Sequence, residues 1–173
     1  MAKLRGAHVT ITASRRAEAL ARDLGADAVI DYESEKLTDH PRDFDAALDM
    51  IGGATLRAVL GLVKRGGTVD SIAGTPEPQT ALKDLGGRRG LAALFWIISL
   101  PLRAAARRAG VRYRFMFAHA DGGDMAEIAA DLDAGRLRVV LDSSFPFAQI
   151  AEAMARLETG RAKGKVVVTM DAP

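Results

Sequence analysis

The sequence has no cysteine and few histidines: His8, His40 and His119 are the three among its 173 residues. The absence of cysteine excludes disulfides and thiolate metal sites, and it is typical of the reducing cytoplasm, where we expect the chain to reside. The histidines are scattered without the spacing of metal ligands, so no metal site is predicted. No Ser-His-Asp or paired-carboxylate arrangement is evident, so no catalytic residue is predicted from spacing.

The sequence also lacks long apolar runs and a large excess of charge. Its longest apolar run, residues 91–102, has about a dozen residues, fewer than the roughly 20 that span a bilayer. Lys and Arg number 24 against 22 Asp and Glu, and this balance is not typical of nucleic-acid binding. With 49% hydrophobic residues, the composition indicates one globular domain with no membrane span and no nucleic-acid partner.

Apolar runs of strand length alternate along the chain with segments of helical period. This pattern predicts an α/β fold with a parallel sheet and helices on its faces. Strands are expected at residues 7–13, 28–30, 44–52, 66–74, 113–117, 137–147 and 164–170. Helices are expected at 15–24, 54–63, 91–109, 121–134 and 148–160, with a break at Pro101 and a Pro- and Gly-rich loop over 75–90.

Six stretches are weak signals singly but specific in combination: AKLRGAHVTITAS, LGADAVIDY, FDAALDMIGG, LVKRGGTVDSIAG, YRFMFAHADGGDMAEIAADLDAGRL and FPFAQIAEAMARLETGRAKGKVVV. Their order and spacing resemble the medium-chain dehydrogenase/reductase superfamily over nearly the whole chain. The resemblance is to its zinc-independent quinone oxidoreductase and enone reductase branch.

The resemblance implies a Rossmann-like doubly wound parallel sheet. Residues 1–144 would be a partial nucleotide-binding domain, and residues 145–173 a segment that packs on a GroES-like catalytic domain. Family members place a first strand and a glycine-rich loop before the helix whose end resembles AKLRGA, and that loop holds the cofactor pyrophosphate. We therefore expect a truncated oxidoreductase that lacks this strand, the loop and the catalytic domain.

The stretch TASRR ends the first expected strand, where Rossmann folds read the adenosine ribose. An acidic residue there would bind the 2′-hydroxyl of NAD, whereas a hydroxyl followed by a guanidinium suits the 2′-phosphate of NADP. Ser14 and Arg15, with Arg16 sharing the role, therefore favour NADP (NADPH). The alternative for Ser14 is a helix N-cap, which is compatible with phosphate binding.

The resemblance implies further cofactor-binding positions, each with a structural alternative. Tyr32 is either an adenosine contact or a rim residue without a ligand. Gly52 is either a cofactor approach point or, with Gly53, a turn residue. Phe115 and Phe117 are either cofactor contacts or core residues. Lys165 is either a cofactor contact or an exposed charge on an edge strand. The full set is Tyr32, Ile51, Gly52, Ile72, Ala73, Gly74, Phe115, Phe117 and Lys165.

The resemblance thus predicts an NADPH-dependent oxidoreductase, present as its cofactor-binding half, with a small-molecule substrate and a homodimeric state. Hydride would pass from the nicotinamide to an activated alkene, quinone or carbonyl. The alternative is a non-catalytic nucleotide-binding or dimerisation module; an unrelated Rossmann-like enzyme such as a methyltransferase is disfavoured by the missing glycine-rich loop. The helix at 91–109 is expected to pack or to line a dimer interface, with an anionic membrane surface as its alternative.

Overall fold

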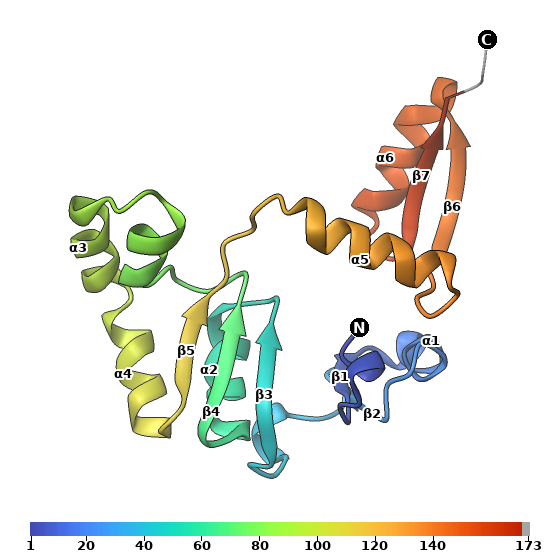
Figure 1. The fold of residues 1–173 in the computed structure, drawn as a ribbon. Helices are drawn as coiled ribbons and strands as arrows, with labels where there is room; N and C mark the ends of the chain where they lie inside the picture. The colour runs from blue at the N-terminus through green and yellow to red at the C-terminus, as the bar shows by residue number, and fades with distance from the viewer. Residues whose placement is uncertain (171–173) are drawn as a thin grey trace. The chain divides into compact units, whose positions relative to one another are not determined.

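The computed structural model describes residues 1–170 and divides into two compact units. Unit 1 contains residues 1–31 together with the chain from residue 121 onward, and unit 2 contains residues 32–120. All strand pairs among the described residues are parallel, and helices connect them (Figure 1). The α/β class predicted from the alternating pattern is therefore confirmed.

In unit 1, β1 (Thr10–Ala13) pairs with β2 (Ala28–Asp31) in parallel, and α1 (Glu18–Asp23) forms the crossover between them. A 3₁₀ turn at Arg15–Ala17 precedes α1, so the helix predicted over 15–24 begins later than expected. Ser14 stands at the N-terminal end of that turn but its side chain makes no capping hydrogen bond. Ser14 therefore occupies the N-cap position of the turn, as the alternative interpretation expected, but without a hydrogen bond from its side chain.

The later part of unit 1 contains a second parallel pair, β6 (Leu141–Pro146) and β7 (Lys165–Thr169), connected through α6 (Ile150–Glu158). It also contains α5 (Gly122–Asp133), whose start is fixed by Asp121. The Asp121 carboxylate accepts hydrogen bonds from the backbone N–H groups of Gly123, at 2.7 Å, and Asp124, at 3.1 Å. Such a cap satisfies donors that have no partner within the helix.

Unit 2 is built on a three-stranded sheet in the order β3-β4-β5: β3 (Phe44–Asp49), β4 (Val63–Ser71) and β5 (Arg112–Phe115). The helix α2 (Gly53–Leu62) connects β3 to β4, and α3 (Arg89–Ile98) and α4 (Leu100–Ala109) lead to β5 (Figure 1). One buried apolar cluster joins α2, α4 and the sheet, and it consists of Leu56, Leu60, Val63, Val69, Leu102, Ala106 and Val111.

The strand β4 begins earlier than the sequence predicted, since the strand was expected to start at the glycine pair Gly66-Gly67. It starts at Val63, directly after α2, so Gly66 and Gly67 lie within the strand and not in a turn before it. The register between β3 and β4 shifts at this point. A Cβ on Gly67 would lie 2.4 Å from the backbone oxygen of Asp45, so glycine is needed for the close approach of the two strands.

The expected break at Pro101 is confirmed: α3 and α4 are bent by 63° with Ser99 between them. Proline at the start of α4 lacks an N–H and prevents one continuous helix. Within residues 1–170, no single helix has both the length and the apolar composition to cross a membrane, although the bent α3–α4 pair meets both criteria together. The loop expected over 75–90 contains a π-helical turn at Thr80–Asp84.

An ion pair in unit 1 makes the stability of the β6-α6-β7 segment sensitive to acid. Arg156 donates two hydrogen bonds to Asp142, at 2.8 and 2.7 Å, and the backbone N–H of Lys163 donates a third at 2.8 Å. These donors hold the pKa of the Asp142 carboxyl, which is 8% exposed, well below its ordinary value. A carboxylate whose pKa is lower in the folded state stabilises the fold above its unfolded-state pKa.

We therefore expect the contribution of Asp142 to be complete at neutral pH and to decline as the pH falls below about 4. Urea denaturation of the wild type and of Arg156→Met, followed by circular dichroism, measures this directly. The difference between the two midpoints should shrink from pH 7 to pH 3, whereas Arg161→Met, on the same segment, should show no such trend. A midpoint difference for Arg156→Met that is constant with pH would contradict the assignment.

Candidate active site at the carboxyl ends of β3, β4 and β5

The carboxyl ends of β3, β4 and β5 meet at one edge of the sheet in unit 2. Ladder pairing places Asp49 beside Ser71, and Ser71 beside Phe115. Beyond the strands, the N–H of Ile72 donates to the backbone oxygen of Asp49 at 3.0 Å, and that of Met116 donates to the oxygen of Ser71 at 2.9 Å. In open α/β sheets this edge is where ligands bind.

A buried carboxylate organises this edge. Asp49 is 3% exposed and accepts a hydrogen bond of 2.6 Å from the hydroxyl of Ser71. Its oxygens also accept from the backbone N–H groups of Gly52, at 3.1 Å, and Ile51, at 3.3 Å. The Ser71 oxygen in turn accepts from the N–H of Ala73 at 3.2 Å. One carboxylate therefore fixes the loops that follow both β3 and β4.

Two glycines allow the backbone to approach closely at this edge. Gly52 has a φ of +78°, and a Cβ there would lie 2.5 Å from the backbone oxygen of Ala73. A Cβ on Gly74 would lie 2.3 Å from the hydroxyl oxygen of Tyr113 and 2.9 Å from Leu56 Cδ2. The glycines are therefore required by packing within the chain, so the turn interpretation of Gly52 has a direct physical basis.

The side chain of Tyr113 lies beside this network, against Gly74. Burial raises its pKa above the ordinary value, and the negative charges of Asp49 and Glu77 raise it further. Its hydroxyl donates to the backbone oxygen of Thr75 at 2.8 Å. The phenol is therefore neutral and acts as a hydrogen-bond donor that ties β5 to the loop after β4.

Apolar side chains are exposed around the same edge. Ile51 is 71% exposed, Ile72 and Phe117 are also exposed, and Phe115 is half-buried. The ring of Phe117 lies 5.7 Å from that of His119. Phe117 is thus not a core residue, whereas Phe115 is partly covered. An exposed apolar rim next to a polar, buried anchor is suited to a flat, partly apolar ligand.

The remaining predicted site residues belong to other parts of the chain. Ser14, Arg15, Arg16 and Lys165 are in unit 1, while Tyr32 is the first residue of unit 2 and is exposed. The structure therefore brings together Ile51, Gly52, Ile72, Ala73, Gly74 and Phe115 at one sheet edge. It does not bring Ser14, Arg15, Arg16 or Lys165 into that unit.

At the end of β1, Arg15 and Arg16 are exposed, and neither guanidinium forms an ion pair or hydrogen bond with any residue in the described range 1–170. The backbone oxygen of Arg16 accepts a hydrogen bond from Lys163 Nζ at 2.9 Å, which adds a third positive charge there. Asp31, the ladder partner of Ala13, is the acidic group of the neighbouring strand end.

The spacing of residues in the sequence did not identify Ser71 and Tyr113 as members of the site. For Ser71 the available signal was its position at the end of an apolar strand, directly after Asp70, on the strand that follows the one ending in Asp49. Tyr113 carried no such signal, because its role depends on the position of the loop after β4. Within the described residues, no group of three or more His, Asp or Glu side chains is placed to hold a metal ion.

Comparison with known proteins identifies the family to which the chain belongs. A zinc-binding dehydrogenase model matches residues 24–168. The zebrafish (Danio rerio) protein named NAD(P)H oxidoreductase RTN4IP1, mitochondrial, is 38% identical over 98% of this chain and 44% of its own length. The NADPH-dependent alkenal/one oxidoreductase of Arabidopsis thaliana chloroplasts is 30% identical over 92% of this chain and 33% of its own.

Among solved structures, the quinone oxidoreductase of Coxiella burnetii matches 96% of this chain and 46% of its own with a TM-score of 0.74 at 23% identity. The chain spans less than half the length of each of these proteins. The name of the zebrafish relative describes that protein as mitochondrial. The cytoplasmic location expected for this chain remains a prediction. The chain belongs to the zinc-binding dehydrogenase family of the medium-chain dehydrogenase/reductase superfamily.

Proposed function

We propose that this chain forms the nicotinamide nucleotide-binding part of an NADPH-dependent oxidoreductase of the quinone or enone reductase type. The single observation that carries the choice of NADPH is the pair of exposed guanidiniums, Arg15 and Arg16, that follow β1 without a partner in the described chain. The names of the relatives, which include an NAD(P)H oxidoreductase and an alkenal/one oxidoreductase, support the reaction class.

The end of β1 has the chemistry of a 2′-phosphate site. The strand β1 ends in Ala13 and is followed by Ser14, so this strand end offers no carboxylate for a ribose 2′-hydroxyl. The Ser14 hydroxyl and the two guanidiniums offer several hydrogen-bond donors to a phosphate, and Lys163 adds a charge at the same turn. Tyr32 is assigned to the adenosine end of the cofactor, and Lys165 is also assigned to cofactor binding.

We assign the nicotinamide ribose to the sheet edge of unit 2, where Asp49 holds the loops after β3 and β4 in place. Gly52, Ala73 and Gly74 lie in these loops. Ile51, Ile72 and Phe117 present exposed apolar surface for the ring face, and the half-buried Phe115 belongs to the same edge. When bound, the cofactor would supply the hydride; these residues would orient it and exclude water.

The test is a calorimetric titration of the chain with NADPH and NADH. We expect NADPH to bind more tightly, and Arg15→Ala to weaken NADPH binding by about 10- to 100-fold, because a hydrogen bond to a charged group contributes roughly 1.5–3 kcal/mol. Binding of NADH should not change. Arg161→Ala, an exposed arginine in the same unit, is the matched control.

Equal affinity for NADPH and NADH would contradict the proposal, as would an Arg15→Ala variant that binds NADPH like the wild type. A folded chain that binds neither nucleotide would favour the non-catalytic module. In the intact enzyme we expect the substrate to be a small molecule with an activated alkene, quinone or carbonyl.

We also propose a homodimer. In the sheet of unit 2, β5 is an edge strand, and Met116 and Phe117 beyond it are exposed. An unpaired edge next to apolar side chains is a template for strand addition by a second copy. Sedimentation equilibrium tests this state, and a monomer at all accessible concentrations would refute it.

A further inference from the structure

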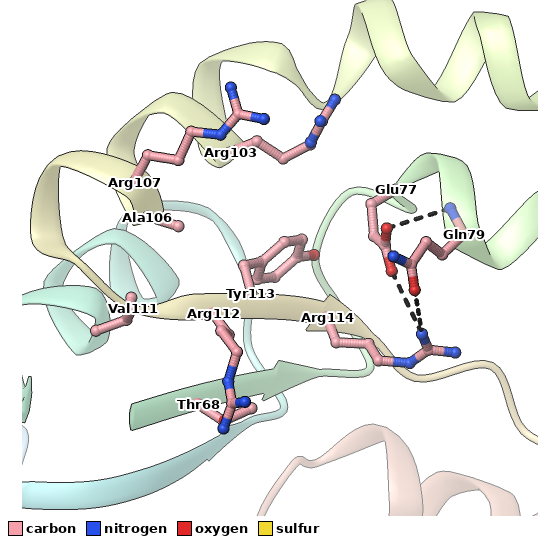
Figure 2. Close-up of a pocket in the computed structure, with 10 residues that line it drawn as sticks. All are labelled: Thr68, Glu77, Gln79, Arg103, Ala106, Arg107, Val111, Arg112, Tyr113 and Arg114. Atoms are coloured by element: carbon pink, nitrogen blue, oxygen red, sulfur yellow. Dashed lines mark hydrogen bonds and ion pairs between the residues drawn. The ribbon is translucent and has the colours of Figure 1, made fainter. Parts of the chain in front are cut away.

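A second site in unit 2 lies beside α4 and β5. A cavity of about 420 Å³ is lined by Thr68, Glu77, Gln79, Arg103, Ala106, Arg107, Val111, Arg112, Tyr113 and Arg114. Figure 2 shows Arg103 and Arg107 extending from α4, and Arg112 and Arg114 from β5. Apart from Tyr113, whose hydroxyl lies against Gly74, these residues differ from the set described at the sheet edge.

The charges that line this cavity do not cancel. Four arginines face one carboxylate, that of Glu77, which lies 3.8 Å from Arg114. Arg114 is also paired with Asp84 at 3.5 Å and donates to Gln79 at 3.1 Å. The acidic groups near the cavity are therefore committed to Arg114, and the other three arginines remain uncompensated.

Those three guanidiniums lack anionic partners within residues 1–170. Arg112 donates to the hydroxyl of Thr68 at 3.1 Å, a neutral acceptor. Arg107 is exposed on α4, one turn after Arg103. The Arg103 Nη1 atom is buried and has no hydrogen-bond partner. Burying a guanidinium nitrogen without a partner is unfavourable, and an anion bound in the cavity would supply the missing acceptor.

The rest of the lining adds apolar surface. Val111 and Ala106 are buried, and the ring of Tyr113 points from β5 toward α4 (Figure 2). The volume is within the roughly 300–1,000 Å³ typical of small-molecule sites, so the cavity has room for an organic group beside the anion. Guanidiniums suit the oxygens of phosphate because they donate in a planar, bidentate geometry.

We infer that this cavity binds the phosphate group of a small phosphorylated metabolite, with Arg103 and Arg107 of α4 as the phosphate ligands and Tyr113, Val111 and Ala106 against its organic part. The site is independent of the nicotinamide cofactor, and its occupation would neutralise the charge between α4 and the edge strand β5.

The test is calorimetric titration of the chain with phenyl phosphate and with inorganic phosphate at low ionic strength. We expect saturable binding of phenyl phosphate, weakened at least tenfold in Arg107→Gln and in Arg103→Met. Arg108→Gln is the matched control, because Arg108 follows Arg107 on α4 but does not line the cavity. The control variant should bind like the wild type. Circular dichroism verifies that each variant is folded.

Thermal unfolding gives a second readout, because a ligand that binds the folded state raises its Tm. Phenyl phosphate should raise the Tm of the wild type and of Arg108→Gln but not that of Arg103→Met. Without ligand, Arg103→Met should melt at or above the temperature of the wild type, since it removes an unpartnered buried nitrogen. If Arg103→Met does not fold, Arg107→Gln, which changes an exposed residue, carries the same comparison.

Each outcome decides the inference. Equal affinity for phenyl phosphate and inorganic phosphate would support a phosphate site and remove the role of the organic group. Equal weakening in Arg108→Gln would show general electrostatic attraction and overturn the site, as would the absence of saturable binding. Arg15→Ala separates this inference from the proposed function: it should leave phenyl phosphate binding unchanged, and loss of that binding would place the phosphate at the end of β1 instead.

Discussion

Replacing Gly52 with alanine is expected to lower the free energy of unfolding of unit 2 by roughly 2–6 kcal/mol. Two effects add: alanine at a φ of +78° and a ψ of −164°, a region that essentially only glycine adopts, costs about 1–3 kcal/mol, and forcing a Cβ into a filled space costs roughly 1–3 kcal/mol. The obstructing atom is the backbone oxygen of Ala73, 2.5 Å from the Cβ position, and a backbone atom cannot move aside as a side chain can.

Urea denaturation followed by tryptophan fluorescence measures this effect, because the single tryptophan, Trp96, lies on α3 in unit 2. Gly53→Ala is the matched control: its φ is +56°, and no atom lies within 4 Å of its Cβ position. It should show the backbone cost alone, about 1–2 kcal/mol. Equal losses in the two variants would mean that the contact with Ala73 contributes nothing.

Replacing Asp49 with alanine is expected to destabilise unit 2 by roughly 2–4 kcal/mol, because it leaves the Ser71 hydroxyl and the Gly52 N–H without their acceptor in a buried place. The carboxylate is 3% exposed, so water does not replace it at the same position. The loops after β3 and β4 lose their common anchor, and nucleotide binding should weaken together with stability.

The same fluorescence measurement applies, with Asp45→Ala as the control on the same strand. Asp45 pairs with Lys64 at 3.0 Å, and its side chain is 89% exposed, so its removal should cost no more than about 1 kcal/mol. Asp49→Asn keeps one acceptor oxygen and should fall between the two. An Asp49→Ala variant as stable as Asp45→Ala would show that the hydrogen-bond network is dispensable.

The fold class could be predicted from the sequence because it depends on local pattern. The alternation of apolar strand runs with helical segments located β2, β3, α2 and α5 to within a few residues. The break between α3 and α4 followed from the chemistry of Pro101 alone. The start of β4 did not follow, because Gly66 and Gly67 look like a turn until the close approach of Asp45 is known.

The candidate site was only partly accessible from the sequence. Strand ends are identifiable, so Ile51, Gly52 and Ile72 could be placed at the ligand edge of the sheet. The bond between Ser71 and Asp49 depends on ladder register, and the role of Tyr113 depends on tertiary packing; neither leaves a local pattern. The uncompensated charge of Arg103 was equally hidden, because charge balance within a cavity is known only once distant segments are brought together.

The edge position of β5 has a consequence for how copies of the chain meet. An antiparallel two-fold pairing of β5 centred on Tyr113 would set Arg112 of one copy opposite Arg114 of the other. Like charges directly opposite each other across a strand pair are destabilising, and charged side chains on exposed edges prevent uncontrolled strand addition. The arginines of β5 would therefore oppose the proposed strand addition, and the carboxylates of Glu77 and Asp84, which pair with Arg114, together with dissolved salt would weaken that repulsion.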